Sequence, residues 1–181
     1  MLSVSYYVAA SLDGFIATKA GGVDWLDCVE VDGEDYGYAE FFNSVDGLLM
    51  GRATYDQARS FGPWLYGNKP CWVWTHRSLA ADEPAIVATA APPRTIVANA
   101  ATQGLQHLWL VGGGKLAALF QAEHLISQYI VSLVPVVLGD GIPLFANAGV
   151  LESLALQDAK PFSSGLVQLT YVPQSRRHSS P

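Results

Sequence analysis

The sequence predicts an α/β domain whose sheet is mixed but mostly parallel, is covered by helices, and ends in an antiparallel C-terminal hairpin. The 181 residues fit one domain, and with half of them apolar and only 14% charged they exclude a disordered chain. Short apolar runs alternate with segments of helical spacing over the first two-thirds of the chain, which is typical of parallel strands. Two β-rich runs then follow without a helix between them, as in an antiparallel pair.

The expected strands are short apolar runs that end at turn signals or glycines. The run at 128–138 contains Pro135, which we interpret as an edge or a bulge because proline cannot donate to a strand ladder. The two runs of the hairpin flank a Ser-Ser-Gly turn at 163–165. The expected strands are 4–10, 46–50, 71–74, 108–111, 128–138, 151–158 and 166–173.

Three segments have helical character. Apolar and aromatic side chains recur at helical spacing over 32–43, and helices are also expected after Arg52 through Arg59 and over 115–122. We expect a long loop over 17–31 and irregular structure over 80–93. The single domain should span 1–174, with 175–181 as a flexible polar tail.

Composition excludes several classes of function. The net charge is −6 and the ten basic residues are scattered, so nucleic acid is not expected as a partner. There is no basic signal region at the N-terminus and no apolar run near the ~20 residues that span a bilayer, so we expect a cytoplasmic protein without membrane contact. Cys28 and Cys71 form no CxxC pair, and the four histidines lack metal-ligand spacing, so neither a disulfide nor a metal is expected.

Three expected strands end in residues suited to a ligand, and in open α/β sheets ligands bind at the carboxyl ends of strands. Residues 51–54 read Gly-Arg-Ala-Thr and open a helix, whose free N–H groups attract anions. Residues 75–77 read Thr-His-Arg, and 112–114 are three glycines that allow close approach to the backbone. Together they suit a phosphorylated dinucleotide. Each has an ordinary alternative: a capped turn, a solvated turn, or glycines required for packing.

Five stretches together resemble the dihydrofolate reductase superfamily, and within it the branch named for the reductase domain of bacterial riboflavin biosynthesis. They occur in the family's order and span most of the chain. The resemblance implies a three-layer α/β/α fold with a mixed, mostly parallel sheet. The stretches are AASLDGFIA at 9–17, LLMGRATY at 48–55, VWTHR at 73–77, LVGGGKL at 110–116 and PVVLGDGIPLF at 135–145.

The resemblance also implies which residues contact a nicotinamide dinucleotide. Ala9 and Ile16 would flank the nicotinamide, Arg52 and Thr54 would meet the phosphates, and the stretch 75–77 would surround an adenosine 2′-phosphate, which implies NADPH. The implied cofactor residues are Ala9, Ile16, Gly51, Arg52, Thr54, Thr75, His76, Arg77, Gly112, Gly113, Gly114, Lys115 and Leu116.

On the substrate side, the resemblance places a carboxylic acid at the start of the helix before the Met-Gly-Arg strand, which by spacing is Asp35. A buried carboxylate there would bind a pterin or aminopyrimidine edge and relay a proton. The alternative is that Asp35 and its acidic neighbours only favour the helix N-terminus electrostatically. Trp25 lies in the loop expected to cover the nicotinamide. Five aromatic side chains suit a flat substrate, or else ordinary packing: Phe15, Trp25, Tyr36, Phe61 and Trp64.

Two departures leave the substrate open. Folate reductases carry an arginine in the stretch after Met-Gly-Arg, but 61–69 holds none. Riboflavin-pathway reductases read Glu-Gly-Gly at the glycine site, but Val111 precedes Gly112 here.

The resulting hypothesis is an NADPH-dependent reductase of a small heterocyclic or imine/carbonyl substrate. The alternatives are a non-catalytic NADPH-binding or redox-sensing module, and a stand-alone 5-amino-6-(5-phosphoribosylamino)uracil reductase. We also expect a homodimer, because dimers occur among the proteins it resembles and the apolar strand at 129–134 ends at a proline expected to mark an edge.

The cofactor prediction can be tested directly. Arg52, His76 and Arg77 lie at strand ends, and 75–77 lacks the carboxylate that an NAD-preferring site often uses for the ribose hydroxyl. Charge-assisted hydrogen bonds to arginine contribute about 1.5–3 kcal/mol each, and ~1.4 kcal/mol gives a tenfold ratio. We expect NADPH to bind at least about tenfold more tightly than NADH, and Arg77→Ala to remove most of that preference while leaving NADH affinity nearly unchanged. Equal affinities in the unmodified protein, by calorimetry at low salt, would reject the assignment.

Overall fold

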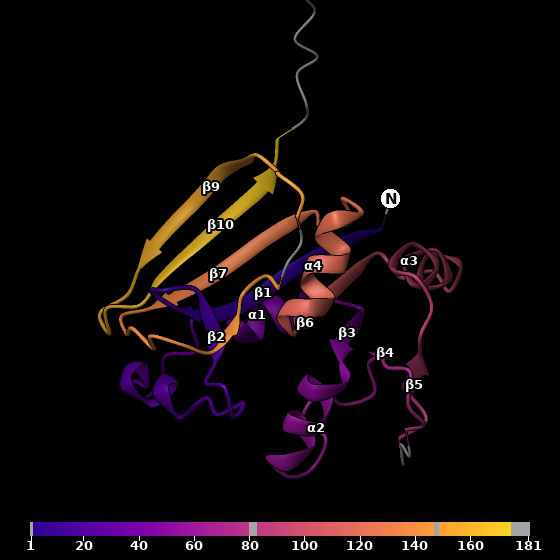
Figure 1. Ribbon diagram of the computed structural model, residues 1–181, viewed down its shortest axis with the longest axis horizontal. Coiled ribbons are helices and arrows are strands. Elements are labelled where there is room, and N and C mark those ends of the chain that lie inside the picture. The colour runs from indigo at the N-terminus through magenta and orange to yellow at the C-terminus, as the bar shows by residue number, and fades with distance from the viewer. Residues whose placement is uncertain (1, 80–82, 147–148, 175–181) are drawn as a thin grey trace, which may run out of the picture.

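The computed structural model describes residues 2–79, 83–146 and 149–174, and an eight-stranded sheet runs through them (Figure 1). The order across the sheet is β5-β4-β3-β6-β1-β7-β10-β9, so the first strand of the chain lies inside the sheet. Its strands are β1 (Ser3–Ser11), β3 (Gly47–Gly51), β4 (Cys71–Trp74), β5 (Ile86–Thr89), β6 (His107–Gly112), β7 (Gln128–Val134), β9 (Leu154–Pro161) and β10 (Val167–Pro173). A separate short pair joins β2 (Phe15–Ala17) to β8 (Ile142–Pro143).

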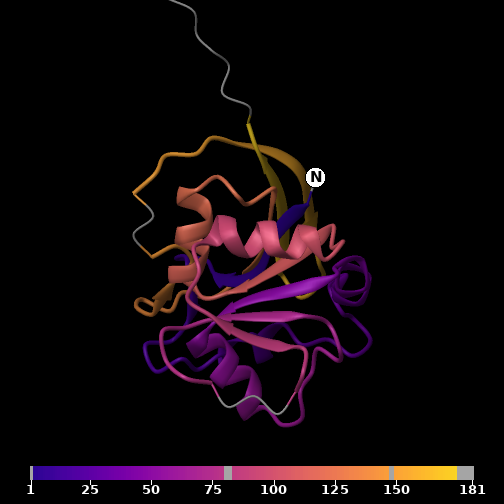
Figure 2. The same ribbon diagram turned by 90° about the vertical axis from the view of Figure 1, so that its right-hand side faces the viewer.

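The pairings confirm the predicted fold class. The pairs from β5 through β7 are all parallel, and β10 pairs antiparallel with both β7 and β9. Two helices, α3 (Pro93–Thr102) and α4 (Gly114–Ala122), cover one face, and α1 (Tyr38–Ser44) and α2 (Arg52–Ser60) cover the other. Figure 2 shows α3 and α4 on the opposite side of the sheet from α2, which gives the three-layer α/β/α arrangement.

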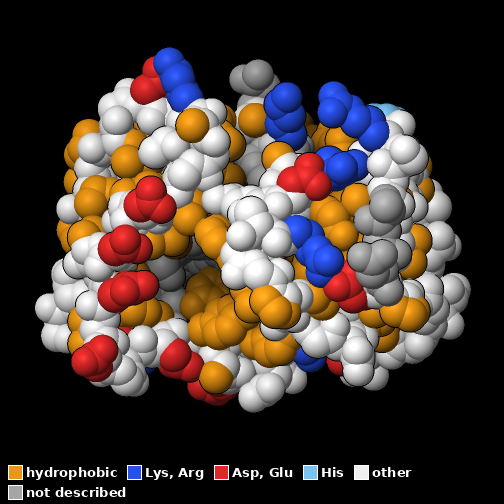
Figure 3. Space-filling model, turned by 90° about the horizontal axis from the view of Figure 1, so that it is seen from below, with side chains coloured by type: hydrophobic (Ala, Val, Ile, Leu, Met, Phe, Trp, Pro, Cys, Tyr) orange, Lys and Arg blue, Asp and Glu red, His pale blue; other side chains and the backbone are white. Residues whose placement is uncertain are grey.

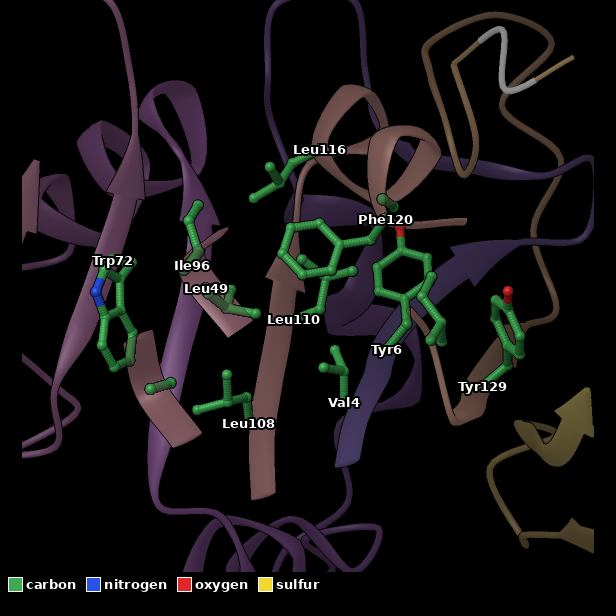
Figure 4. Packing of buried hydrophobic residues seen from close by; sticks show 13 residues of the cluster. Val4, Tyr6, Leu49, Trp72, Ile96, Leu108, Leu110, Leu116, Phe120 and Tyr129 are labelled. Atoms are coloured by element: carbon green, nitrogen blue, oxygen red, sulfur yellow. The ribbon is translucent and has the colours of Figure 1, made fainter. Parts of the chain in front are cut away.

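Alternating side chains of the central strands fill the two layers of core. Val4, Tyr6 and Leu110 point toward α4 and meet Phe120, which is fully buried there (Figure 4). On the opposite face, the side chains of β3 and β4 pack with Trp109 against the aromatic residues of α1 and α2. The strands at the centre are therefore buried on both faces, as in parallel sheets generally.

Three predicted boundaries were wrong. The first hairpin strand, expected over 151–158, is Leu154–Pro161, and the other two errors have local backbone reasons. The helix expected over 32–43 begins only at Tyr38, because Gly33, Tyr36 and Gly37 all have positive φ and turn the chain before it. The strand expected over 128–138 ends at Val134, directly before Pro135. The expected edge was also wrong: β7 lies between β1 and β10, inside the sheet.

Five elements were missed: β5, α3, a 3₁₀ helix, and the two strands of the short pair, β2 and β8. The stretch expected to be irregular contains the strand β5, whose few residues are largely exposed at the sheet edge and so carry no clear alternation. The helix α3 begins at the C-terminal end of that stretch, with Pro93 in its first turn. The loop expected over 17–31 holds a 3₁₀ helix, Asp24–Val29, and is preceded by β2.

None of the helices in the described ranges is long and apolar enough to cross a bilayer. The tail predicted at 175–181 lies outside the described residues.

Candidate functional site

The carboxyl ends of four neighbouring strands, β4, β3, β6 and β1, meet at one edge of the sheet. Two helices begin there: α2 starts at Arg52, directly after β3, and α4 starts at Gly114, one residue after β6. The two starts are close, because a Cβ placed on Gly51 would lie 3.6 Å from the nitrogen of Gly113. The first turn of each helix carries N–H groups without intrahelical partners and a partial positive charge, and both features favour an anion.

The three consecutive glycines have three different reasons to be glycine. Gly112 has a φ of +136°, which other residues rarely adopt, and its peptide bond to Gly113 is cis. A Cβ on Gly113 would lie 3.4 Å from Oγ1 of Thr54, so the bare backbone faces α2. A Cβ on Gly114 would lie 2.1 Å from the carbonyl oxygen of Pro143, which no side chain allows. Of the three, only Gly113 is partly exposed and can be approached by a ligand, while Gly112 is needed for its positive φ and Gly114 for packing.

Basic side chains gather around the ends of β3 and β4. Arg52 bonds Asp56 through Nε at 2.7 Å and donates from Nη1 to the carbonyl of Ser78 at 3.1 Å, which holds it beside the loop after β4. In that loop, buried Thr75 accepts the N–H of Arg77 at 3.1 Å, and the Arg77 side chain is exposed. The Arg52 guanidinium thus lies beside the backbone of Ser78, the residue that follows Arg77.

The other predicted cofactor residues divide into those that present side chains and those that present only backbone. His76 is exposed and its ring lies 5.1 Å from the ring of Trp74. Lys115 is exposed, whereas Leu116 is only 2% exposed and packs in the core, so it can offer a ligand no more than its backbone. Ile16 reaches the glycines, since its Cδ1 lies 3.9 Å from a Cβ built on Gly113.

The edge is hollowed, and its two sides differ in charge. Figure 3, which views this end of the molecule, shows a hollow lined by hydrophobic side chains, with acidic side chains along one side and basic ones on the other. The segment 24–35, at the lower left of Figure 1, carries six exposed acidic side chains. Ala9 lies half-buried near the end of β1, and like Trp25 and Tyr36 it packs against a small buried cluster, Val29, Val134 and Leu166.

Asp35 is exposed, so the expectation of a buried carboxylate was wrong. Its two oxygens accept the N–H groups of Ala39 at 3.0 Å and Gly37 at 2.9 Å, at the start of α1. These backbone hydrogen bonds, Ala39 first, hold the pKa of Asp35 below its usual range, so the group is ionised at neutral pH. The geometry is that of the electrostatic alternative, in which the carboxylate supports the helix start.

The five aromatic side chains expected around a flat substrate are divided between two clusters. Trp25 and Tyr36 pack against the same buried cluster as Ala9, whereas Trp64 packs with Tyr55 of α2 and with Tyr66, and Phe61 is 61% exposed. The indole N–H of Trp25 is buried and has no hydrogen-bond partner among the described residues. A buried donor without a partner is costly, and because the surrounding protein covers this nitrogen, a bound ligand does not satisfy it.

Comparison with known proteins decides the family. The model of the RibD C-terminal domain matches residues 3–168. This chain belongs to the RibD C-terminal domain family. Two curated proteins of Bacillus subtilis (strain 168) cover it almost end to end: "Uncharacterized protein YwjB", 36% identical over 92% of this chain and 95% of its own, and "Uncharacterized protein YyaP", 31% identical over 91% of each.

Solved structures agree with the family. A putative riboflavin biosynthesis protein from Shewanella sp. PV-4 superposes with a TM-score of 0.87 at 30% identity, over 96% of this chain and all of the other. The deaminase/5-amino-6-(5-phosphoribosylamino)uracil reductase of Thermotoga maritima has a TM-score of 0.74 at 16% identity, over 96% of this chain and 57% of its own, which shows the fold alone. The resemblance found in the sequence is thereby confirmed.

The family motif at 9–17 has a structural role that the sequence reading missed. Oγ of Ser11 donates to Asp13 at 2.6 Å, and the Asp13 carboxylate accepts the N–H groups of Leu138 at 3.1 Å and Gly139 at 2.7 Å. Two motifs far apart in the chain are thus joined beside the hollow. An aspartate two residues after a serine, before a glycine, was the available signal, because short polar side chains bond nearby backbone in turns.

A row of polar side chains on the sheet was also missed. Ser132 lies opposite Ala9 in the β1–β7 register, and Gln168 lies opposite Ser132 in the β7–β10 register. The signal was a polar residue in the interior of each of two largely apolar runs, at positions that face each other across the sheet.

The packing of Gly114 gives a matched pair of variants. We expect Gly114→Ala to lower the free energy of unfolding by about 1–3 kcal/mol, because the added methyl overlaps the Pro143 carbonyl and backbone must move. Gly51→Ala should change it by less than about 0.5 kcal/mol, since its φ of −74° suits alanine and its new contacts are ordinary. Denaturant unfolding measures both, and equal midpoints would contradict the geometry.

The Asp13 clamp predicts an acid-sensitive stability. The Ser11 hydroxyl, and after it the N–H groups of Leu138 and Gly139, lower the pKa of Asp13 in the folded state, so unfolding takes up a proton. The stabilisation is complete above the ordinary carboxyl pKa of about 3.9 and is lost as the pH falls through the lower folded value. Asp13→Asn should therefore be less stable than the unmodified protein at pH 6, with a smaller difference at pH 3. A difference that stays constant with pH would contradict the clamp.

Proposed function

We propose that this protein is an NADPH-dependent reductase that transfers a hydride to a C=N or C=O carbon of a small heterocyclic or imine-like substrate. Membership in the RibD C-terminal domain family supports a reductase. The single observation that carries the cofactor proposal is the convergence of two helix starts, with bare glycine backbone between them and arginines beside them. The NADPH preference, the substrate and the cytoplasmic location are parts of the proposal.

The described residues fit a phosphorylated dinucleotide. The first turns of α2 and α4 offer N–H donors for a diphosphate, and Gly113 and Thr54 leave room for it to approach. Arg77 and His76 would contact the 2′-phosphate. Arg52 would lie between the diphosphate and the 2′-phosphate. When bound, the cofactor supplies the hydride, and the protein contributes position and electrostatics. Ala9 and Ile16 would hold the nicotinamide at the end of β1.

The negative charge on the acidic side of the hollow bears on which substrate can bind there. Residues 20–51 contain eight acidic residues and no lysine, arginine or histidine. A phosphate-bearing substrate on that side would be repelled, and a like-charge juxtaposition costs binding energy. We therefore favour an uncharged or cationic heterocycle over the phosphoribosyl pyrimidine named for the Thermotoga maritima enzyme.

A panel of substrates tests the function. NADPH oxidation should be measured by stopped flow against pterins, cyclic imines, and 5-amino-6-ribosylaminouracil with and without its 5′-phosphate. We expect turnover with an uncharged heterocycle and a higher kcat/KM for the form without the phosphate. Tight NADPH binding without turnover on any compound would favour the sensing module instead. A strong preference for the phosphorylated form would favour the stand-alone riboflavin-pathway enzyme.

A further inference from the structure

We propose that the hydroxyl of Tyr7 donates the proton that completes the reduction, and that Gln168 holds it in position. This inference rests on the proposed function. Hydride addition to a C=N or C=O carbon moves the π electrons onto nitrogen or oxygen, which must then take a proton. The Tyr7 O–H bond breaks to supply it, and the resulting phenolate recovers a proton from water.

The position of Tyr7 follows from the strand. Tyr7 and Ala9 are two residues apart on β1, so their side chains lie on the same face of the sheet. Ala9 is where the nicotinamide would be held, which makes Tyr7 the next side chain along that strand on the substrate side. Its ring is fixed by edge-to-face packing on Phe41 at 4.5 Å and by Trp109 at 6.1 Å.

The hydroxyl is met by a polar group built from three other elements. Nε2 of Gln168 lies 3.4 Å from the Tyr7 oxygen, 3.2 Å from Oγ of Ser132 and 3.2 Å from the carbonyl oxygen of Tyr36. The Tyr7 hydroxyl in turn donates to that carbonyl at 3.4 Å. All four distances are at or beyond the usual upper limit of about 3.2 Å for a good hydrogen bond, so a ligand atom can compete for the Tyr7 proton.

The alternative proton source is less suitable. Asp35 is ionised, and both its oxygens already accept N–H groups of α1, so at neutral pH it has no proton to give. A phenol remains protonated at neutral pH, and burial raises the pKa of Tyr7 further. It can still protonate an amide or alkoxide anion, because those anions are far more basic. The hydrogen bond from Gln168 acts in the opposite direction on that pKa, by stabilising the phenolate.

Three variants test the assignment with the best substrate of the panel. Tyr7→Phe should lower kcat by about a hundredfold or more, the usual contribution of a general acid, with the Kd for NADPH unchanged by fluorescence. Tyr38→Phe is the matched control, because Tyr38 packs on Trp109 in the same layer and none of the polar group's hydrogen bonds involves it. It should keep the kcat of the unmodified protein. Gln168→Leu should lower kcat less than Tyr7→Phe does.

The pH profile separates proton donation from a structural role. A general acid must be protonated, so kcat should fall at alkaline pH as Tyr7 ionises. A ring-fluorinated tyrosine at position 7 is more acidic and should move that fall to lower pH, whereas Gln168→Leu should move it higher. The negative charges of Asp35 and of ionised Tyr38 also raise the pKa of Tyr7, so Asp35→Asn should keep the alkaline fall and move it to lower pH.

The results distinguish a wrong assignment of Tyr7 from a wrong proposed function. If Tyr7→Phe keeps kcat, or the fluorinated residue leaves the profile unmoved, the assignment of Tyr7 is overturned and the reductase stands. If Asp35→Asn abolishes turnover while Tyr7→Phe does not, the proton comes from the carboxylate. If the unmodified protein oxidises NADPH with no compound, the proposed function fails and this inference with it. Circular dichroism of each variant shows whether a loss of kcat is only a loss of fold.

Discussion

The candidate site lies at the carboxyl ends of the parallel strands, and its arrangement depends on the pairing of β6 with β3 on one side and with β1 on the other. Leu108 and Leu110 take part in both pairings and are fully buried, so the order of the strands is specified by the core. Because all three strands run the same way, their carboxyl ends come together. Gly51 and Gly112 are the last residues of β3 and β6, and this is why two helices can begin within a few ångströms of each other.

That constraint also explains why the two sides of the hollow differ. The connections that follow β3 and β4 carry arginines. The connection that follows β1 contains the long acidic segment, which turns back over the sheet. The glycines lie between them. A ligand spanning the edge would therefore place its anionic part over the helix starts and an uncharged part against Ala9 and Trp25. The division of charge follows from chain topology, since each side is supplied by a different connection.

The fold was more predictable from the sequence than the site. Buried parallel strands such as 46–50 and 108–111 are nearly continuous apolar runs, and a glycine follows each. The sequence therefore predicts both the strand and the position where it ends. The strand β5 could not be predicted, because an edge strand with one buried residue has no apolar pattern. Asp35 illustrates the harder problem. Its type and position suit either acid chemistry or helix support, and only the positive φ values of Tyr36 and Gly37, which turn the backbone amides toward it, distinguish the two.

Those same turns connect the start of α1 to the polar group on the sheet. Tyr36 has a φ of +57°, held by its N–H bond to Glu34 at 2.8 Å and by its hydroxyl, which bonds the carbonyl of Val29 and Oγ of Ser164. In that conformation its carbonyl points back to Tyr7 and Gln168. A residue fixed at both ends thus carries the acceptor that orients the polar group. The acidic segment is therefore more than a charged rim, because its backbone completes the group beneath it.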